Sequence, residues 1–318
     1  MFFAMSKRAF LLIVSVAMLG TALVARGQMP RTSASQPSQA STPSQTAPQM
    51  PAGSSETPDV QHDVPYGTIG GHSLLLDVYL PAEHSDLRPA VVLIHGGGWT
   101  SFDKSTMVGM GKFLARSGFV AFSVDYRLFH DNENLWPAQL DDVQRAVRWI
   151  RANAAKYRVD AEHIGAFGHS AGAQLAALLG MEETRDNSDP GLAKYSSRVQ
   201  AVVDVSGPSD FTVHRDADGD AFLSSFFGGD YAHAEKAWQD ASPVFHVAKK
   251  VSPFLIVHGT KDSDVPIAQA QELVDKLKQA GASVNFVTVE DVHTFQTPEV
   301  KRQLALDTRD FFMQYLSR

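Results

Sequence analysis

The amino-acid sequence predicts an α/β fold in which helices flank both faces of a mostly parallel central sheet. Short, continuous apolar runs, typical of strands buried on both faces, recur along the chain. Between them lie longer segments, several of which have apolar residues at helical spacing. A chain that alternates between these two patterns places its strands in one sheet and its helices on either side of it.

The expected strands and helices alternate from residue 74 onward. A first strand, 74–80, ends at Pro81, and the uninterrupted apolar run 90–94 forms the next one. Helix 107–117 ends before Gly118, because glycine is common just beyond a helix C-terminus. The remaining expected elements are strand 119–124, helix 140–155, strand 164–167, helix 173–179, strands 199–205 and 254–257, helix 265–280, strand 284–289 and helix 301–316.

A serine stands at the bend between strand 164–167 and helix 173–179. The sequence there is Gly168-His169-Ser170-Ala171-Gly172. A G-x-S-x-G pattern in a strand–turn–helix context predicts a nucleophile elbow, and glycines flank the serine because a Cβ would clash in so sharp a bend. The alternative is a glycine-rich turn with an ordinary surface serine, and the rest of the sequence decides between the two.

A run of three glycines follows strand 90–94, in His95-Gly96-Gly97-Gly98-Trp99. Consecutive glycines at a strand end carry a high entropic cost and pack nothing. Their use is to expose backbone N–H groups at close range, as an oxyanion hole requires, and the other donor should be the N–H of Ala171. An ordinary glycine-rich turn is the alternative.

An acid and a base follow the serine in chain order. Asp262 comes just after strand 254–257, and His293 comes just after strand 284–289. Asp264 is the alternative acid, although either aspartate could be a solvated loop charge or a helix N-cap, a role that suits Asp264. Serine, then aspartate, then histidine is the α/β-hydrolase order, and parallel strands bring their carboxyl ends to one edge of the sheet.

With these residues in place, the chain resembles the α/β-hydrolase esterases over residues 66–316. The resemblance is strongest to carboxylesterases and carbohydrate esterases of the hormone-sensitive-lipase and bifunctional feruloyl/acetyl esterase type. It implies an α/β-hydrolase fold, a catalytic triad and an oxyanion hole with Gly96 as an alternative donor. The motifs that carry it are HGGGW at 95–99, DYRL at 125–128, PAQLDD at 137–142, WIR at 149–151, GHSAG at 168–172, HGTKD at 258–262, VP at 265–266 and HTF at 293–295. The implied site residues are Ser170, Asp262 and His293 for the triad and Gly97, Gly98 and Ala171 for the oxyanion hole.

Only about 30 residues lie between the predicted linker and strand 90–94, so we expect no large N-terminal cap domain of the kind that some of these esterases carry, and any cover over the site should come from a loop. The best candidate is 210–240, which is rich in aromatic residues. Trp99, Phe226 and Phe227 are the expected substrate contacts, since aromatic side chains over an esterase site would meet a sugar ring or an aromatic acyl group. Packing of these aromatic residues onto the sheet edge is the alternative.

Three regions are expected along the chain. Residues 1–27 read as a signal peptide, because Lys7 and Arg8 precede an uncharged apolar run and small residues follow it. A retained membrane anchor is the competing interpretation. Residues 28–58, rich in Ser, Thr, Gln and Pro, are too polar to bury a core and should form a disordered linker. The catalytic domain should then occupy 59–318, and the protein should be secreted or periplasmic.

The whole-chain composition excludes several classes of function. A net charge of −7 over 318 residues leaves no basic surface for nucleic acid. The chain has no cysteine and no zinc-binding pattern such as H-E-x-x-H, which argues against thiolate catalysis and a zinc site. A Ser-His-Asp mechanism needs neither a metal nor an organic cofactor, so none is expected.

The prediction is therefore a serine carboxylesterase acting on short-chain acyl esters or on acetyl or feruloyl esters of carbohydrates. Its partner is a small-molecule or polysaccharide-linked ester, with no membrane contact after signal cleavage. A peptidase of the prolyl-oligopeptidase type is the first alternative. A non-catalytic binding module on a hydrolase scaffold is the second.

Overall fold

The computed structural model describes residues 57–82, 85–184, 188–213 and 217–317. The predicted signal peptide and all but the last two residues of the predicted linker lie outside these ranges and stay predictions. No helix within these ranges is long and apolar enough to cross a membrane. The first strand begins at Asp59, where the catalytic domain was expected to start.

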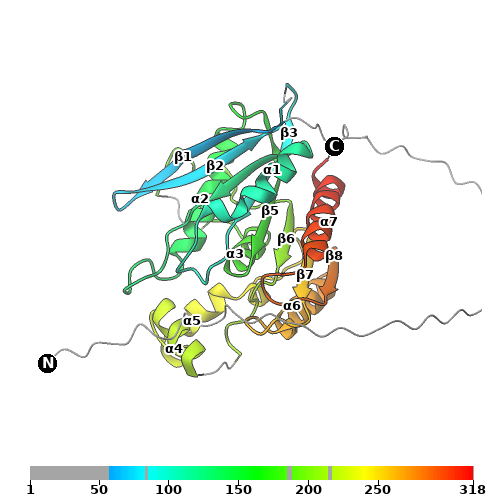
Figure 1. The fold of residues 1–318 in the computed structure, drawn as a ribbon. Helices are drawn as coiled ribbons and strands as arrows, with labels where there is room; N and C mark the ends of the chain where they lie inside the picture. Colours follow the sequence, from blue (N-terminus) through cyan, green and yellow to red (C-terminus); the bar gives the residue numbers. More distant parts are fainter. Residues whose placement is uncertain (1–56, 83–84, 185–187, 214–216, 318) are drawn as a thin grey trace, which may run out of the picture. The chain divides into compact units, whose positions relative to one another are not determined.

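Eight strands in this part of the chain form one sheet, in the order β1-β2-β4-β3-β5-β6-β7-β8 (Figure 1). From β4 onward every neighbouring pair is parallel, whereas β1–β2 and β2–β4 are antiparallel. The strands are β1 (Asp59–Ile69), β2 (His72–Leu80), β3 (Arg88–Ile94), β4 (Val120–Val124), β5 (Val159–His169), β6 (Ala201–Val205), β7 (Phe254–Gly259) and β8 (Val284–Val289). The predicted mostly parallel sheet is confirmed, and with it the α/β-hydrolase fold.

Helices cover both faces of this sheet and create two apolar cores. Alternate residues of β3 show the division: Val92 and Ile94 belong to one core, and Val91 and Leu93 belong to the other. Helices α2, α3 and α6 pack in the first core, and α1 and α7 pack in the second. The α-helices are α1 (Val108–Arg116), α2 (Ala138–Ala152), α3 (Ala171–Leu179), α4 (Ala217–Phe226), α5 (Tyr231–Ala241), α6 (Ile267–Gln279) and α7 (Pro298–Leu316), with short 3₁₀ helices η1 (Lys104–Met107) and η2 (Pro243–Phe245).

The structure corrects the sequence-based expectation in three places. Strand β1 was not predicted, because it lies at the sheet edge and most of its side chains are partly or fully exposed, so it lacks an apolar run. Strand β5 begins at Val159, several residues before the predicted start, in a stretch where its pairing with β3 shifts register. The predicted loop 210–240 is largely helical and forms α4 and α5. Apolar side chains of both helices pack into the first core.

Candidate active site

Ser170 occupies the sharp turn between β5 and α3. Its backbone has φ 55° and ψ −122°, a conformation that costs a non-glycine residue about 1–3 kcal/mol. The two flanking glycines let the chain make this turn. A Cβ on Gly168 would lie 2.1 Å from the Gly172 carbonyl oxygen, and a Cβ on Gly172 would lie 2.2 Å from that of Ile94. The predicted elbow geometry is therefore present.

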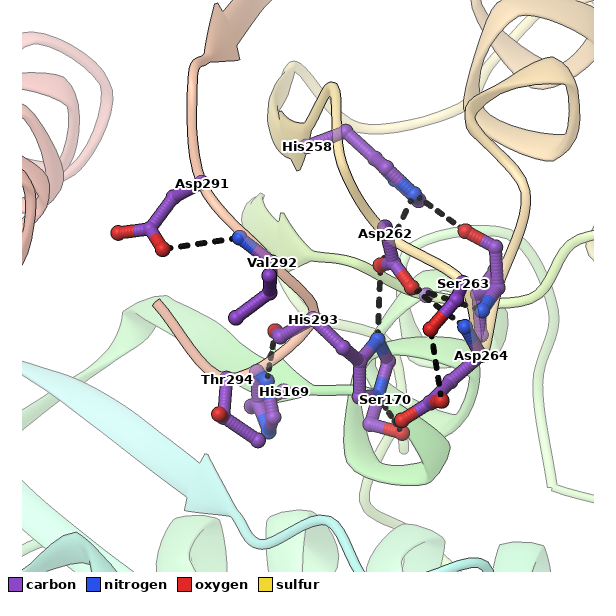
Figure 2. Close-up of polar contacts among 12 residues, drawn as sticks. His169, Ser170, His258, Asp262, Ser263, Asp264, Asp291, Val292, His293 and Thr294 are labelled. Carbon is purple, nitrogen blue, oxygen red and sulfur yellow. Dashed lines mark hydrogen bonds and ion pairs between the residues drawn. The ribbon is translucent and has the colours of Figure 1, made fainter. Parts of the chain in front are cut away.

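Ser170, His293 and Asp262 lie in line and are joined by hydrogen bonds (Figure 2). The Oγ of Ser170 is 2.8 Å from Nε2 of His293, and Nδ1 of His293 is 2.8 Å from Oδ2 of Asp262. An ionised carboxylate can only accept, so Nδ1 is the donor in the second bond. In the neutral imidazole, Nε2 is then free to accept the Ser170 hydroxyl proton.

Asp262, and not Asp264, contacts His293. The side chain of Asp262 is fully buried, and its Oδ1 accepts hydrogen bonds from the N–H groups of Asp264 and Val265 at 3.0 and 2.9 Å. Burial raises the pKa of the Asp262 carboxyl, but hydrogen bonds from His258, His293 and the Val265 N–H outweigh that effect. Its pKa therefore lies well below the ordinary value, so Asp262 is ionised at neutral pH.

His258 supports Asp262 in a way that the sequence did not predict. Its Nε2 donates to the Val265 carbonyl at 2.8 Å and lies 3.3 Å from Oδ2 of Asp262. A histidine in a strand-end turn commonly bonds loop backbone, as His258 does, whereas its contact with the carboxylate is specific to this site. A buried histidine four residues before the acid was the available signal.

Two further residues hold the segment that carries His293. Both Asp291 carboxylate oxygens accept from loop N–H groups, those of Val292 and Gln296 on Oδ1 and that of Thr297 on Oδ2. The second residue is His169, beside the serine. Its Nε2 donates to the His293 carbonyl at 3.0 Å, as Figure 2 shows. Burial lowers the pKa of His169, which favours the neutral ring.

The predicted oxyanion donors lie in peptides whose orientation is fixed by other contacts. The Gly96 carbonyl accepts from Nδ1 of His95, and the Gly97 carbonyl accepts from the N–H groups of Thr100 and Ser101. Because N–H and C=O point in opposite directions in a trans peptide, the N–H groups of Gly97 and Gly98 point away from these partners. The N–H of Ala171 is the first in α3, so it has no partner inside the helix. Within the described ranges, none of these three groups donates a hydrogen bond.

The aromatic residues predicted to contact substrate lie in the protein interior. Trp99, Phe226 and Phe227 are 5%, 0% and 5% exposed. The rings of Trp99 and Phe226 stack with centroids 5.0 Å apart, and Nε1 of Trp99 donates to Gln174. This is the packing arrangement that stood as the alternative, and it corrects the expected role, because side chains buried to this extent offer a substrate almost no surface.

A match to a known protein family covers most of the site residues described above. The BD-FAE family model matches residues 76–277, a range that holds the glycine run, the elbow and Asp262. The chain belongs to the BD-FAE family. The predicted resemblance to α/β-hydrolase esterases is thereby confirmed.

Relatives of this BD-FAE chain are named as esterases. The probable carboxylic ester hydrolase LipM of Mycobacterium tuberculosis is 32% identical over 224 residues, covering 68% of this chain and 51% of LipM. The chain spans about half the length of the curated relatives it matches.

Solved structures show the same fold. A truncated carbohydrate esterase from gut microbiota superimposes with a TM-score of 0.71 and 29% identity, covering 84% of this chain and 100% of that one. The propionate-bound esterase Est2 of Thermogutta terrifontis has a TM-score of 0.68 and 26% identity, covering 85% and 98%.

Proposed function

We propose that this protein hydrolyses carboxylic esters through an acyl-enzyme intermediate on Ser170. The observation that carries the proposal is the hydrogen-bonded series Ser170–His293–Asp262, with the serine held at a strained elbow. The esterase names of its relatives support the same reaction.

In the first half-reaction, Oγ of Ser170 attacks the ester carbonyl carbon while Nε2 of His293 takes the hydroxyl proton. Asp262 stays ionised, holds the imidazole by Nδ1 and stabilises the imidazolium that forms. The carbonyl oxygen becomes an oxyanion that accepts hydrogen bonds from the N–H groups of Gly97, Gly98 and Ala171. Loss of one such donor costs about 3–4 kcal/mol of transition-state stabilisation.

The tetrahedral intermediate then collapses to the ester of Ser170. The bond to the alcohol oxygen breaks, and His293 returns its proton to that oxygen, so the alcohol leaves neutral. In the second half-reaction a water molecule, deprotonated by His293, attacks the acyl carbon and releases the acid. Ser170 recovers its proton from His293.

The substrates we propose are short-chain acyl esters and acetyl or feruloyl esters of carbohydrates. The similarity to a carbohydrate esterase supports the second group, and the similarity to a propionate-bound esterase supports the first. A panel of p-nitrophenyl acetate, acetylated xylan and methyl ferulate ranks these groups by kcat/KM.

The decisive test replaces Ser170 by alanine. Ser170→Ala should lower kcat for p-nitrophenyl acetate by a factor of about 10⁵ or more, since no other group can attack the carbonyl. Ser263→Ala, which alters an exposed serine beside Asp262, is the matched control and should stay within about twofold of the wild type. An organophosphate that labels serine nucleophiles should modify the wild type at Ser170, one mole per mole.

Retained activity in Ser170→Ala would contradict the assignment. Cleavage of peptide p-nitroanilides at rates above those of esters would favour the peptidase alternative. A wild type that neither turns over esters nor takes up the organophosphate would favour the binding-module alternative.

A further inference from the structure

A large aromatic side chain stands in solvent directly after the glycine run. Phe102 lies between β3 and η1 and is 64% exposed. Trp99, three residues earlier, turns into the core instead and is 5% exposed. An exposed phenyl ring forgoes the burial that normally stabilises this side chain, so its position contributes little to the fold.

The backbone of Phe102 is strained as well as exposed. Its φ is 68°, in the left-handed region, where a bulky residue is a genuine outlier. The loop is fixed on both sides of it: the Ser101 N–H donates to the Gly97 carbonyl at 3.1 Å, and the Lys104 N–H donates to Oδ1 of Asp125 at 2.7 Å. The backbone of Phe102 is therefore flanked by ordered contacts, and strain retained at such a position points to function.

Phe102 lies beside the proposed oxyanion hole. A Cβ on Gly97 would lie 2.7 Å from Cδ2 of Phe102, so the ring edge packs against that glycine. A Cβ on Gly96 would lie 3.3 Å from Cβ of Ser170, so the same glycine run also borders the nucleophile. Gly96 and Gly97 therefore lie between the exposed ring and Ser170.

We infer that Phe102 determines specificity for the acyl group of the ester, by forming an apolar wall beside the oxyanion donors; this rests on the function proposed above. The leaving alcohol must lie within hydrogen-bond reach of Nε2 of His293, which protonates it. The acyl group then extends on the glycine side, where Phe102 stands. The substrates that gain this apolar contact are esters with an acyl chain of several carbons or an aromatic acyl group, because an acetyl group is too short to cover the ring.

The test compares acyl chains on one leaving group. The ratio of kcat/KM for p-nitrophenyl hexanoate to that for p-nitrophenyl acetate should fall about tenfold in Phe102→Ala, since the longer chain loses its apolar contact. Phe102→Leu should retain most of the ratio. The control is Leu87→Ala, which removes an exposed apolar side chain (54% exposed) just before β3, at the opposite end of that strand from the glycine run, and should leave the ratio unchanged.

Two further measurements separate specificity from structure. Phe102→Gly should raise the midpoint of thermal unfolding, since glycine accepts the left-handed backbone, and should still lose the hexanoate preference. With acetate fixed and the alcohol lengthened from methyl to hexyl, Phe102→Ala should match the wild type.

An unchanged acyl ratio in Phe102→Ala, or a change confined to the alcohol series, would overturn the inference while leaving the esterase function intact. A wild type that hydrolyses none of these esters would refute the proposed function itself, and the role of Phe102 with it.

Discussion

At the scale of single residues, the three hydrogen-bonded side chains depend on neighbours that position them. His258 lies against the Asp262 carboxylate, His169 donates to the His293 carbonyl, and Asp291 holds the loop that carries His293. Each contact joins residues from different strand ends or within one tight loop. The reacting groups are thus fixed from both sides before any substrate binds, which is how enzymes lower the cost of reaching the transition state.

The roles of Asp262 and Asp264, which are separated by one residue, can be compared by substituting each of them. Asp262→Asn should lower kcat for p-nitrophenyl acetate by about 10⁴, because an amide does not hold the required tautomer of His293. Asp264→Asn should stay within about threefold of the wild type, since Asp264 contacts Asp262 through its backbone N–H. Steady-state kinetics on both variants, with circular dichroism to confirm folding, decide the matter. A larger loss in Asp264→Asn would reverse the assignment of the acid.

At the scale of elements, the parallel strands gather the site at one edge of the sheet. Ser170 follows β5, the glycine run follows β3, Asp262 follows β7 and His293 follows β8. Neighbouring strands carry the serine and the glycines, because β3 pairs with β5. Strand β6 stands between β5 and β7 and carries a buried carboxyl group, Asp204, that takes no part in the proposed reaction.

Asp204 should make the stability of the protein depend on pH. Burial raises its pKa to about 6, despite the hydrogen bond that it accepts from the Gly207 N–H. The folded protein thus binds this proton more tightly than the unfolded chain does. The stabilisation is complete below about pH 4, the unfolded pKa, and is lost as the pH rises through about 6, at a cost of about 3 kcal/mol.

Denaturant unfolding at pH 4.5 and pH 7 checks this dependence. The free energy of unfolding of the wild type, relative to Asp204→Asn, should decrease as the pH rises, because asparagine does not titrate. Asp59→Asn, at an exposed position in β1, is the control and should show a much smaller change. A constant difference between the wild type and Asp204→Asn would show that Asp204 does not titrate in this range.

At the scale of the whole molecule, the described domain begins with β1 and ends with α7. It contains one sheet and two apolar cores. The core on the α2–α3–α6 side also takes in the aromatic side chains of α4 and α5. Helices α4 and α5 are therefore packed parts of the fold and are not an unstructured cover.

A variant that begins at Thr57 tests whether this domain is sufficient. It should unfold within about 2 °C of the full chain, because residues 1–27 are predicted to be a signal peptide and the polar residues 28–56 are predicted to bury too little apolar surface to stabilise the fold. Its kcat/KM for p-nitrophenyl acetate should stay within about twofold. Calorimetry and steady-state kinetics measure both. A drop in the unfolding temperature beyond about 5 °C, or loss of activity, would show that the N-terminal region contributes to the folded domain.

The sequence alone was sufficient to predict the fold class and the serine, aspartate and histidine that are hydrogen-bonded in the site. Buried parallel strands appear in the sequence as apolar runs. The elbow and the glycine run are local patterns, because only certain residues can adopt the backbone conformations that they require. The order of Ser170, Asp262 and His293, each after a predicted strand, then implied that their side chains meet at one edge. Edge strand β1 was not predicted because most of its side chains are partly or fully exposed, so it has neither an apolar run nor a clear apolar–polar alternation.

Only the tertiary structure decided which side chains face inward. Trp99 and Phe102 stand three residues apart in one glycine-rich loop and both have positive φ, yet one is buried and the other is exposed. That difference depends on their contacts. Trp99 contacts Gln174 and Phe226, which lie far away in the sequence, whereas Phe102 lies beside Gly97 of the same turn. The same dependence on distant partners separates Asp262 from Asp264 and gives His169 its contact with His293. Local sequence fixes backbone shape, whereas the burial of a side chain depends on contacts between distant parts of the chain.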